Sequence, residues 1–309
     1  MSAQPATEQR YVGSAHKSDT RFKRLVAGIR EHLLLMPAML ILFGLVIYPL
    51  FFSLGKSLTD YNLGMPGEAF IGLKNYLSAF QDKGFLASMG FGAMYSVCAV
   101  SLELLLGFAT ALLLRREFLG KRIVTVLLIT PMMVTPVVVG IIWMLMFQPQ
   151  FSVINGVLLH LGIEGPIWLQ GVATARIATI IADVWQWTPF FTLVLLAGLL
   201  NLPGDILEAA QVDGASGWKT LWAIILPIMK PLILVVVLIR LIDSFKTFDS
   251  VYIMTNGGPG TSTELVSLHI YRTGLPYMNM SYASAQSFIF LIVLTIATMF
   301  LVRQLRRAE

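Results

Sequence analysis

The sequence predicts an all-α membrane protein with six transmembrane helices. Hydrophobic residues make up 56% of the 309 residues and charged residues only 13%, whereas about a quarter of the residues in soluble domains are charged. The mean hydropathy is +0.76. Apolar runs of roughly 20 residues recur along the chain, and each is long enough to cross about 30 Å of hydrocarbon. Because these apolar runs take up most of the chain, the sequence predicts one membrane domain rather than two soluble domains.

Six apolar windows of about 19 residues mark the expected spans. They lie near residues 33–54, 88–114, 123–147, 173–198, 228–252 and 283–302. The first run is too long for the core of a cleavable signal, so we expect it to remain as an anchor. The first 20 residues are polar and have no apolar periodicity, which predicts a disordered cytoplasmic tail at residues 1–30, followed by a transmembrane domain at residues 31–309.

Lys and Arg are distributed unequally between the two sides of the expected spans. Fifteen of them lie in the N-terminal segment, the loops after the second and fourth spans and the C-terminal tail, and four lie in the other loops. Basic residues are retained on the cytoplasmic side of membrane proteins. Both termini are therefore expected to be cytoplasmic, and the formal charge of +5 does not indicate nucleic-acid binding.

Redox, metal and ATP chemistry are not expected of this chain. Its single cysteine, Cys98, lies within an apolar run, and its four histidines are far apart, so neither a disulfide nor a metal site is predicted. A GxxxxGK[ST] phosphate loop does not occur, because Gly120-Lys121 is followed by Arg122 and lacks the upstream glycine. We expect no enzyme activity and no bound cofactor.

The loop at residues 199–227, between the fourth and fifth spans, has the pattern of two short helices joined by a turn. Asp205 can cap the first helix, and Glu208 can return a hydrogen bond three residues later. Gly214 allows a left-handed helix end. The second helix is expected to start at Ser216, and its apolar face comprises Trp218, Leu221 and Trp222. The sequence therefore predicts a helix-turn-helix elbow.

A helix of about eight residues is unstable alone in water, so the first helix of the elbow must pack against something else. Its apolar residues suggest a partner subunit, and they are Ile206, Leu207, Ala210 and Val212. Packing against the inner surface of its own bundle is the alternative that the spacing leaves open.

Charged residues within the spans are costly in hydrocarbon and usually face a cavity or a partner. In the fifth span four of them alternate in sign at intervals of three and can pair along one side of the helix: Arg240, Asp243, Lys246 and Asp249. Counting from Pro231 places Asp243 about 18 Å into the span, near the membrane midplane. Phe245 and Phe248 lie among these charges.

Two interpretations of these residues remain open, a ligand pocket and a buried ion-pair network. A pocket with aromatic rings and charged groups suits a hydroxylated, partly apolar ligand. Glu103 in the second span and Asp183 in the fourth are possible partners of the charges in either case, and Asp183 is followed by Trp185, Trp187 and Pro189. Together with Pro131 and Pro136 in the third span, Pro189 predicts a bend or a gate.

The elbow resembles the EAA signature of bacterial ABC-importer permeases, in which Glu-Ala-Ala is followed after three residues by Gly and after nine more by Ile-x-Leu-Pro. The resemblance implies a coupling helix seated in a cleft on a cytosolic ATPase subunit, which would bind ATP and Mg²⁺. It assigns the contact with this subunit to Glu208, Ala209, Ala210, Asp213, Gly214, Ile224, Leu226 and Pro227.

Three further segments resemble permeases for sugars, polyols and glycerol phosphate: residues 70–76, 183–190 and 240–260. The resemblance extends from about residue 30 to the end, with Asn256 where many relatives carry glycine. It implies alternating access in the bacterial inner membrane, in contact with lipid, a second and different permease subunit, two nucleotide-binding ATPase subunits and an extracytoplasmic solute-binding protein. The possible substrate path then comprises Asp183, Trp185, Trp187, Arg240, Asp243, Phe245, Lys246, Phe248 and Asp249.

Two other classes of protein are weaker alternatives. An ion-coupled secondary transporter of a small polar solute could also use the charges of the fifth span, but it leaves the elbow unexplained. A membrane-embedded enzyme would need a convergent nucleophile and base or a set of metal ligands, and the sequence has no clustered His or Cys.

Overall fold

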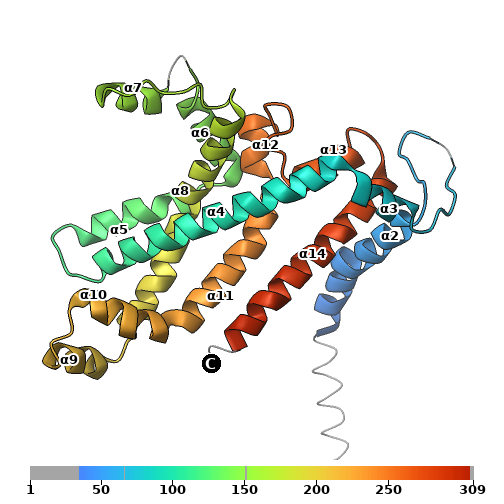
Figure 1. The fold of residues 1–309 in the computed structure, drawn as a ribbon. Helices are drawn as coiled ribbons and strands as arrows, with labels where there is room; N and C mark the ends of the chain where they lie inside the picture. The colour runs from blue at the N-terminus through green and yellow to red at the C-terminus, as the bar shows by residue number, and fades with distance from the viewer. Residues whose placement is uncertain (1–34, 66, 150–151, 307–309) are drawn as a thin grey trace, which may run out of the picture. The chain divides into compact units, whose positions relative to one another are not determined.

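The computed structural model describes residues 35–65, 67–149 and 152–306, and in these ranges the regular secondary structure is helical (Figure 1). An isolated antiparallel bridge joins Thr59 and Phe70. Contacts divide the chain into two units, Met1–Lys56 and Ser57–Glu309. Five helices within the described residues are long and apolar enough to cross a membrane, and one bent pair would make a sixth. The tail predicted at residues 1–30 lies outside the described residues.

The first unit contributes one apolar helix, Leu35–Ser57, which ends at the first residue of the second unit. It contains a π-helical turn, Phe43–Ile47, followed by α2, Tyr48–Ser57. No side chain of the π-helical turn is buried. Apolar side chains around the whole helix suit a lipid environment rather than water.

The second unit is built on the contact between α4, Lys83–Leu114, and α8, Val172–Leu200. A Cβ added at Gly107 of α4 would lie 2.4 Å from the Cβ of Phe191 in α8, so only glycine allows the two backbones to approach this closely. One turn further along α4, the Thr110 hydroxyl forms a 2.6 Å hydrogen bond with the Thr192 hydroxyl of α8. The pair is therefore joined by both close packing and a polar contact.

The other helices of this unit pack onto the pair. Helix α11, Leu226–Phe245, contacts α4 and α8, and α14, Met280–Arg306, contacts α11. The shorter helices that lie between the long ones in sequence include α3 (Lys74–Gln81), α7 (Val153–His160), α12 (Asp249–Thr255) and α13 (Val266–Gly274). Helices α3 and α13 pack against α14.

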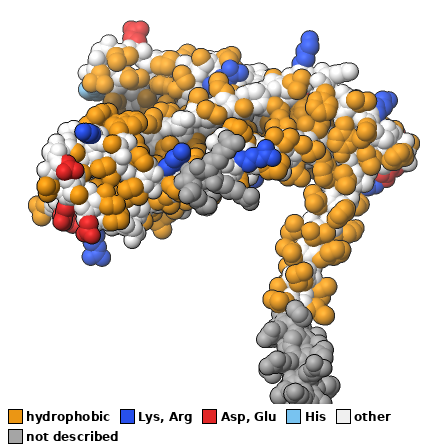
Figure 2. Space-filling view, turned by 60° about the horizontal axis from the view of Figure 1, so that its bottom comes forward, with side chains coloured by type: hydrophobic (Ala, Val, Ile, Leu, Met, Phe, Trp, Pro, Cys, Tyr) orange, Lys and Arg blue, Asp and Glu red, His pale blue; other side chains and the backbone are white. Residues whose placement is uncertain are grey.

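Large apolar side chains are exposed on the outer faces of the long helices. On α4 they include Leu102, Leu105 and Leu113, and on α14 they include Ile296 and Phe300. Hydrophobic side chains also dominate the face shown in Figure 2. An exposed apolar surface of this extent would cause a soluble protein to aggregate, and it fits a protein surrounded by lipid.

The third predicted span, 123–147, is not one straight helix. Helix α5, Lys121–Ile129, and a 3-10 turn, Thr130–Met133, are followed by α6, Pro136–Met146, after a bend of 102°. Thr135 is extended because the residue before a proline avoids the helical region. The carbonyl of Val134 accepts a 3.0 Å hydrogen bond from Nε2 of Gln186 in α8. The two helices together make one bent candidate span, and the expectation of a bend at these prolines is confirmed.

The fifth predicted span, 228–252, also differs from the observed helix, which runs from Gly217 to Phe245. It comprises α10 (Gly217–Thr220), a π-helical turn (Leu221–Ile225) and α11. The chain leaves the helix at Lys246 and begins α12 at Asp249, whose carboxylate favours a new helix N-terminus. Asp249 therefore does not share a helix with Arg240, and Asp243 lies near the end of its helix rather than at its middle.

Candidate functional site

The predicted elbow between the fourth and fifth spans is present as two helices joined by a tight turn (Figure 1). The first is α9, Gly204–Val212. Gly214 has φ +71°, and the N–H groups of Gly214 and Ala215 donate to the carbonyls of Gln211 and Ala210. The Ser216 hydroxyl accepts a hydrogen bond from the Lys219 N–H at 3.3 Å and caps α10. The left-handed end at Gly214 and the helix start at Ser216 are therefore confirmed.

The start of α9 was predicted incorrectly. Pro203 occupies the cap position, no side chain caps the helix, and Asp205 lies in the first turn. Proline fixes the backbone just before the helix, so the chain enters α9 one residue before Asp205. The carboxylate of Asp205 still lies next to the positive end of the helix dipole.

The two faces of α9 have different surroundings. Ala210 is buried and Leu207 packs against the core cluster that contains Phe191, Leu195 and Ile225. In contrast, Val212 is 88% exposed, and Ile206, Glu208 and Ala209 are also exposed. Packing against its own bundle therefore holds α9 in place by one face and leaves the other face uncovered in this chain.

The remaining residues of the EAA pattern follow the turn. Asp213 and Gly214 are exposed at the end of α9, Ile224 and Leu226 are half-buried, and Pro227 is exposed in the first turn of α11. Leu221 packs against the core cluster, whereas Trp218 and Trp222 are exposed and stack edge to face with ring centroids 5.7 Å apart. The second helix thus has its apolar residues on two faces rather than on one.

Arg240 is at the centre of a buried cluster of charges that joins three spans. Its guanidinium lies 3.0 Å from a carboxylate oxygen of Glu103 in α4 and 2.6 Å from one of Asp183 in α8. Arg240 is 1% exposed, Glu103 0% and Asp183 3%. The carbon at the centre of the guanidinium also lies 4.9 Å from the Trp187 ring centroid. The prediction that Glu103 and Asp183 are possible partners of the charges is confirmed, and Arg240 itself is enclosed.

A polar pocket of about 270 Å³ lies beside this cluster. Its lining comprises Pro136, Asp183, Gln186, Trp187, Asp243, Lys246, Thr247, Phe248, Asp249 and Ser250. Asp243 is 47% exposed and lies 3.8 Å from Arg240 and 3.7 Å from Lys246. The end of α11 and the start of α12 therefore bring together six residues of the predicted substrate path.

The other three residues of that path do not line the polar pocket. Arg240 lies behind it, and the ring of Phe245 lies beside Phe290 of α14, with centroids 6.4 Å apart. Trp185 points to the opposite side of α8, where it lines an apolar cavity of about 610 Å³ and contacts Trp143. Trp185 and Trp187 were grouped by sequence, but residues two apart on a helix face different directions.

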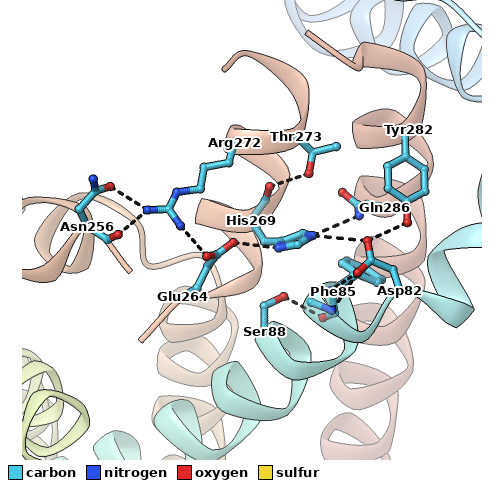
Figure 3. A network of polar contacts seen from close by, with 11 residues as sticks. Asp82, Phe85, Ser88, Asn256, Glu264, His269, Arg272, Thr273, Tyr282 and Gln286 are labelled. Carbon is cyan, nitrogen blue, oxygen red and sulfur yellow. Dashed lines mark hydrogen bonds and ion pairs between the residues drawn. The ribbon is translucent and has the colours of Figure 1, made fainter. Parts of the chain in front are cut away.

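At the end of the bundle away from the elbow, a network of polar side chains links α4, α13, α14 and the loop before α13 (Figures 1 and 3). Glu264 accepts from Arg272 Nη1 at 2.5 Å and contacts His269 Nδ1 at 2.8 Å. Arg272 also donates to the backbone carbonyl of Asn256. Asp82 accepts hydrogen bonds from the N–H groups of Gly84 and Phe85, which explains why α4 begins before the predicted residue 88.

Burial and hydrogen bonding act in opposite directions on the two carboxylates of this network. Burial raises the pKa of Glu264, but the hydrogen bond with His269 and the charge of Arg272 outweigh it and lower the pKa. For Asp82, burial is likewise outweighed by hydrogen bonds from Phe85, Tyr282 and Gly84, and its pKa is lowered. Sequence reasoning missed this network because its members come from segments up to 200 residues apart, such as Asp82 and Tyr282.

Comparison with known proteins identifies the family. A model described as "Binding-protein-dependent transport system inner membrane component" matches residues 103–308. A probable ABC transporter permease protein of Sinorhizobium fredii is 39% identical over 277 residues, which cover 89% of each chain. The permease protein of a trehalose/maltose transport system of Thermococcus litoralis is 34% identical over 86% of this chain and 90% of its own.

A solved structure has the same fold. It is a bacterial ABC transporter involved in the import of the acidic polysaccharide alginate, and it matches with a TM-score of 0.80 at 22% identity over 93% of this chain and 99% of its own. The helical membrane bundle with an elbow between its fourth and fifth spans is thus the ABC-importer permease fold. The chain is a multi-pass membrane protein that belongs to the family of binding-protein-dependent transport system inner membrane components.

Proposed function

We propose that this chain forms half of the pore of an importer that is driven by a separate ATPase, and that α9 is the surface on which the ATPase acts. The observation that carries this proposal is the asymmetry of α9. One face is fixed to the bundle through Leu207 and Ala210, while Glu208, Ala209 and Val212 are exposed. A short helix fixed in this way can transmit a displacement of its outer face to the spans that it joins.

The exposed face suits a protein partner better than lipid. It combines an apolar side chain, Val212, with the carboxylates of Asp205, Glu208 and Asp213, all exposed. Carboxylates are unfavourable against an anionic membrane surface and favourable against donors in a protein cleft. The partner complex would comprise a second, different permease subunit, two ATPase subunits that bind ATP and Mg²⁺, and a solute-binding protein on the outer side.

Photo-cross-linking tests the docking surface in the intact transporter. A photoreactive amino acid at Val212, which is 88% exposed, should cross-link to the ATPase subunit. The matched control is Tyr277, which is 71% exposed and lies in the loop before α14, at the other end of the bundle from the elbow. Equal cross-linking of the ATPase from both positions, or none from Val212, would contradict the proposal.

The polar pocket supports import of an uncharged, hydroxyl-rich solute such as a sugar or polyol. Asp243 and Asp249 contribute two carboxylates to its lining, against the single ammonium group of Lys246, while Asp183 shares the charge of Arg240 with Glu103. Carboxylates accept hydrogen bonds from hydroxyl groups and repel anions. The rings of Trp187 and Phe248 add the aromatic surface on which sugars pack. A glycerol-phosphate-like anion fits this lining less well.

Ligand binding by the companion solute-binding protein tests the substrate class. A panel of neutral sugars, polyols, sugar acids and glycerol phosphate should give binding by one or more of the neutral compounds. Uptake of that compound by the reconstituted transporter should require ATP. Binding restricted to the anionic compounds, or uptake driven by an ion gradient without ATP, would contradict the proposal.

A further inference from the structure

A groove of about 670 Å³ lies where the end of α4 meets the elbow. Its floor is apolar and includes Leu112 of α4 together with Leu221 and Ile225 of the π-helical turn. Its rim includes Arg115 and Arg116, directly after α4, and Gln211 of α9. The groove is therefore amphiphilic, with two guanidinium groups at one edge of an apolar surface.

The two arginines have no acidic partner within the described part of the chain. The nearest carboxylate in sequence, Glu117, forms an ion pair with Lys121 at 2.7 Å. Arg115 is half-buried, and its side chain forms neither an ion pair nor a hydrogen bond with a described residue. A partly desolvated cation is stabilised by an anion from outside the chain.

The groove lies beside the ends of two helices that are long and apolar enough to span a membrane, which is where lipid headgroups meet the protein. Leu112 is two residues from the end of the spanning helix α4, and Leu221 is close to the start of the spanning helix Gly217–Phe245. On a neighbouring face of that second helix, Trp218 is 71% exposed and Trp222 is 58% exposed. Exposed tryptophans with a flanking lysine, here Lys219, are typical of a helix at the membrane interface.

We infer that this groove binds the phosphate headgroup of an anionic phospholipid, whose acyl chain covers the apolar floor. Charge complementarity at Arg115 and Arg116 selects the anion, and the apolar floor selects a lipid over a soluble phosphate. The inference rests on the proposed function in one respect, because it takes the elbow to lie at the cytoplasmic surface. It does not use the proposed ATPase contact, because Glu208, Ala209 and Val212 are not part of the lining.

Native mass spectrometry of the complete transporter, titrated with phosphatidylglycerol and with phosphatidylcholine, tests the inference. The wild type should retain phosphatidylglycerol preferentially. An R115Q/R116Q variant should lose about 30-fold in apparent affinity for phosphatidylglycerol, since two basic side chains near the surface are removed. The matched control, R122Q, changes an exposed arginine in the first turn of α5, outside the groove, and should leave the preference unchanged.

Three further measurements separate this lipid site from other roles. R115K/R116K keeps both charges and should keep the preference, which distinguishes lost binding from misfolding. An unchanged preference in R115Q/R116Q, or full displacement of the lipid by inorganic phosphate, would overturn the inference. Loss of the ATPase subunit from purified R115Q/R116Q would also overturn it by placing the ATPase in the groove, while leaving the proposed function intact.

Discussion

Removing Arg240 should destabilise the bundle more than removing any other single charge of the pocket region. In an R240M variant the carboxylates of Glu103 and Asp183 lose the cation that lies 3.0 Å and 2.6 Å from them, and both remain buried. Breaking a buried ion pair by removing one partner costs about 3–5 kcal/mol. Because Arg240 joins α4, α8 and α11, the loss should appear in global unfolding.

The free energy of unfolding can be measured by SDS titration in mixed micelles. K246M is the matched control, because it makes the same substitution in a side chain that is 56% exposed and that pairs, among the described residues, only with Asp243 at 3.7 Å. It should cost no more than about 1 kcal/mol. The triple variant R240M/E103Q/D183N removes all three charges and should regain most of the lost stability. An R240M protein as stable as K246M would refute the argument that these charges depend on one another.

Three other predictions follow from packing, titration and pocket chemistry. G107V should disrupt the contact between α4 and α8, because the Cβ of the valine would lie 2.4 Å from that of Phe191, and it should therefore lower the apparent Tm. G90V is the control, because a Cβ at Gly90 has no atom within 4 Å, and it should leave the Tm unchanged. Equal Tm values for the two variants would contradict this. Because the pKa of Glu264 is lowered on folding, the ionised carboxylate stabilises the folded protein fully above about pH 5, and this contribution is lost as the pH falls through the folded-state pKa. The fall in Tm on acidification should therefore be smaller in E264Q than in the wild type, and identical slopes would contradict this. D243N should raise the KM for uptake about tenfold or more, because it removes a charged hydrogen-bond acceptor from the pocket. E117Q, which changes an exposed carboxylate outside the pocket, is the control. An unchanged KM in D243N would remove Asp243 from the substrate path.

Local sequence signals predicted the parts of this structure that depend on local physics. Apolar runs located the spans, and the left-handed end at Gly214 and the cap at Ser216 followed from the preferences of those residue types. The bend at Pro136 could also be expected, although not its angle of 102°. Each of these features depends on a few neighbouring residues, so one sequence is enough.

Features that depend on packing between distant segments were not predictable in this way. The end of α11 at Phe245 was missed because the apolar pattern continues through Val251 and Ile253, which lie on a separate short helix. Trp185 was grouped with the possible substrate path, although it faces an apolar cavity rather than the polar pocket. The network around Glu264 and Asp82 could have been suspected from polar residues near helix ends, but their pairing is set by the tertiary fold.

The central claim is that the elbow transmits the action of a separate ATPase, and Gly214 offers the most direct test of it. A Cβ at Gly214 meets no atom of this chain within 4 Å, so within the chain a substitution acts through its φ of +71°, which costs a residue other than glycine about 1–2 kcal/mol. The elbow should therefore distort without a clash elsewhere. G204V is the matched control, because Gly204 is also in open space and has no positive φ.

The measurement is ATP-dependent solute uptake by proteoliposomes that contain the complete transporter and its binding protein. We predict that G214V inserts and assembles normally but loses most uptake and the stimulation of ATP hydrolysis by the loaded binding protein, while G204V retains both. If G214V changes the conformation of residues 204–216 and uptake is nevertheless complete, the claim that the elbow transmits the action of the ATPase is contradicted.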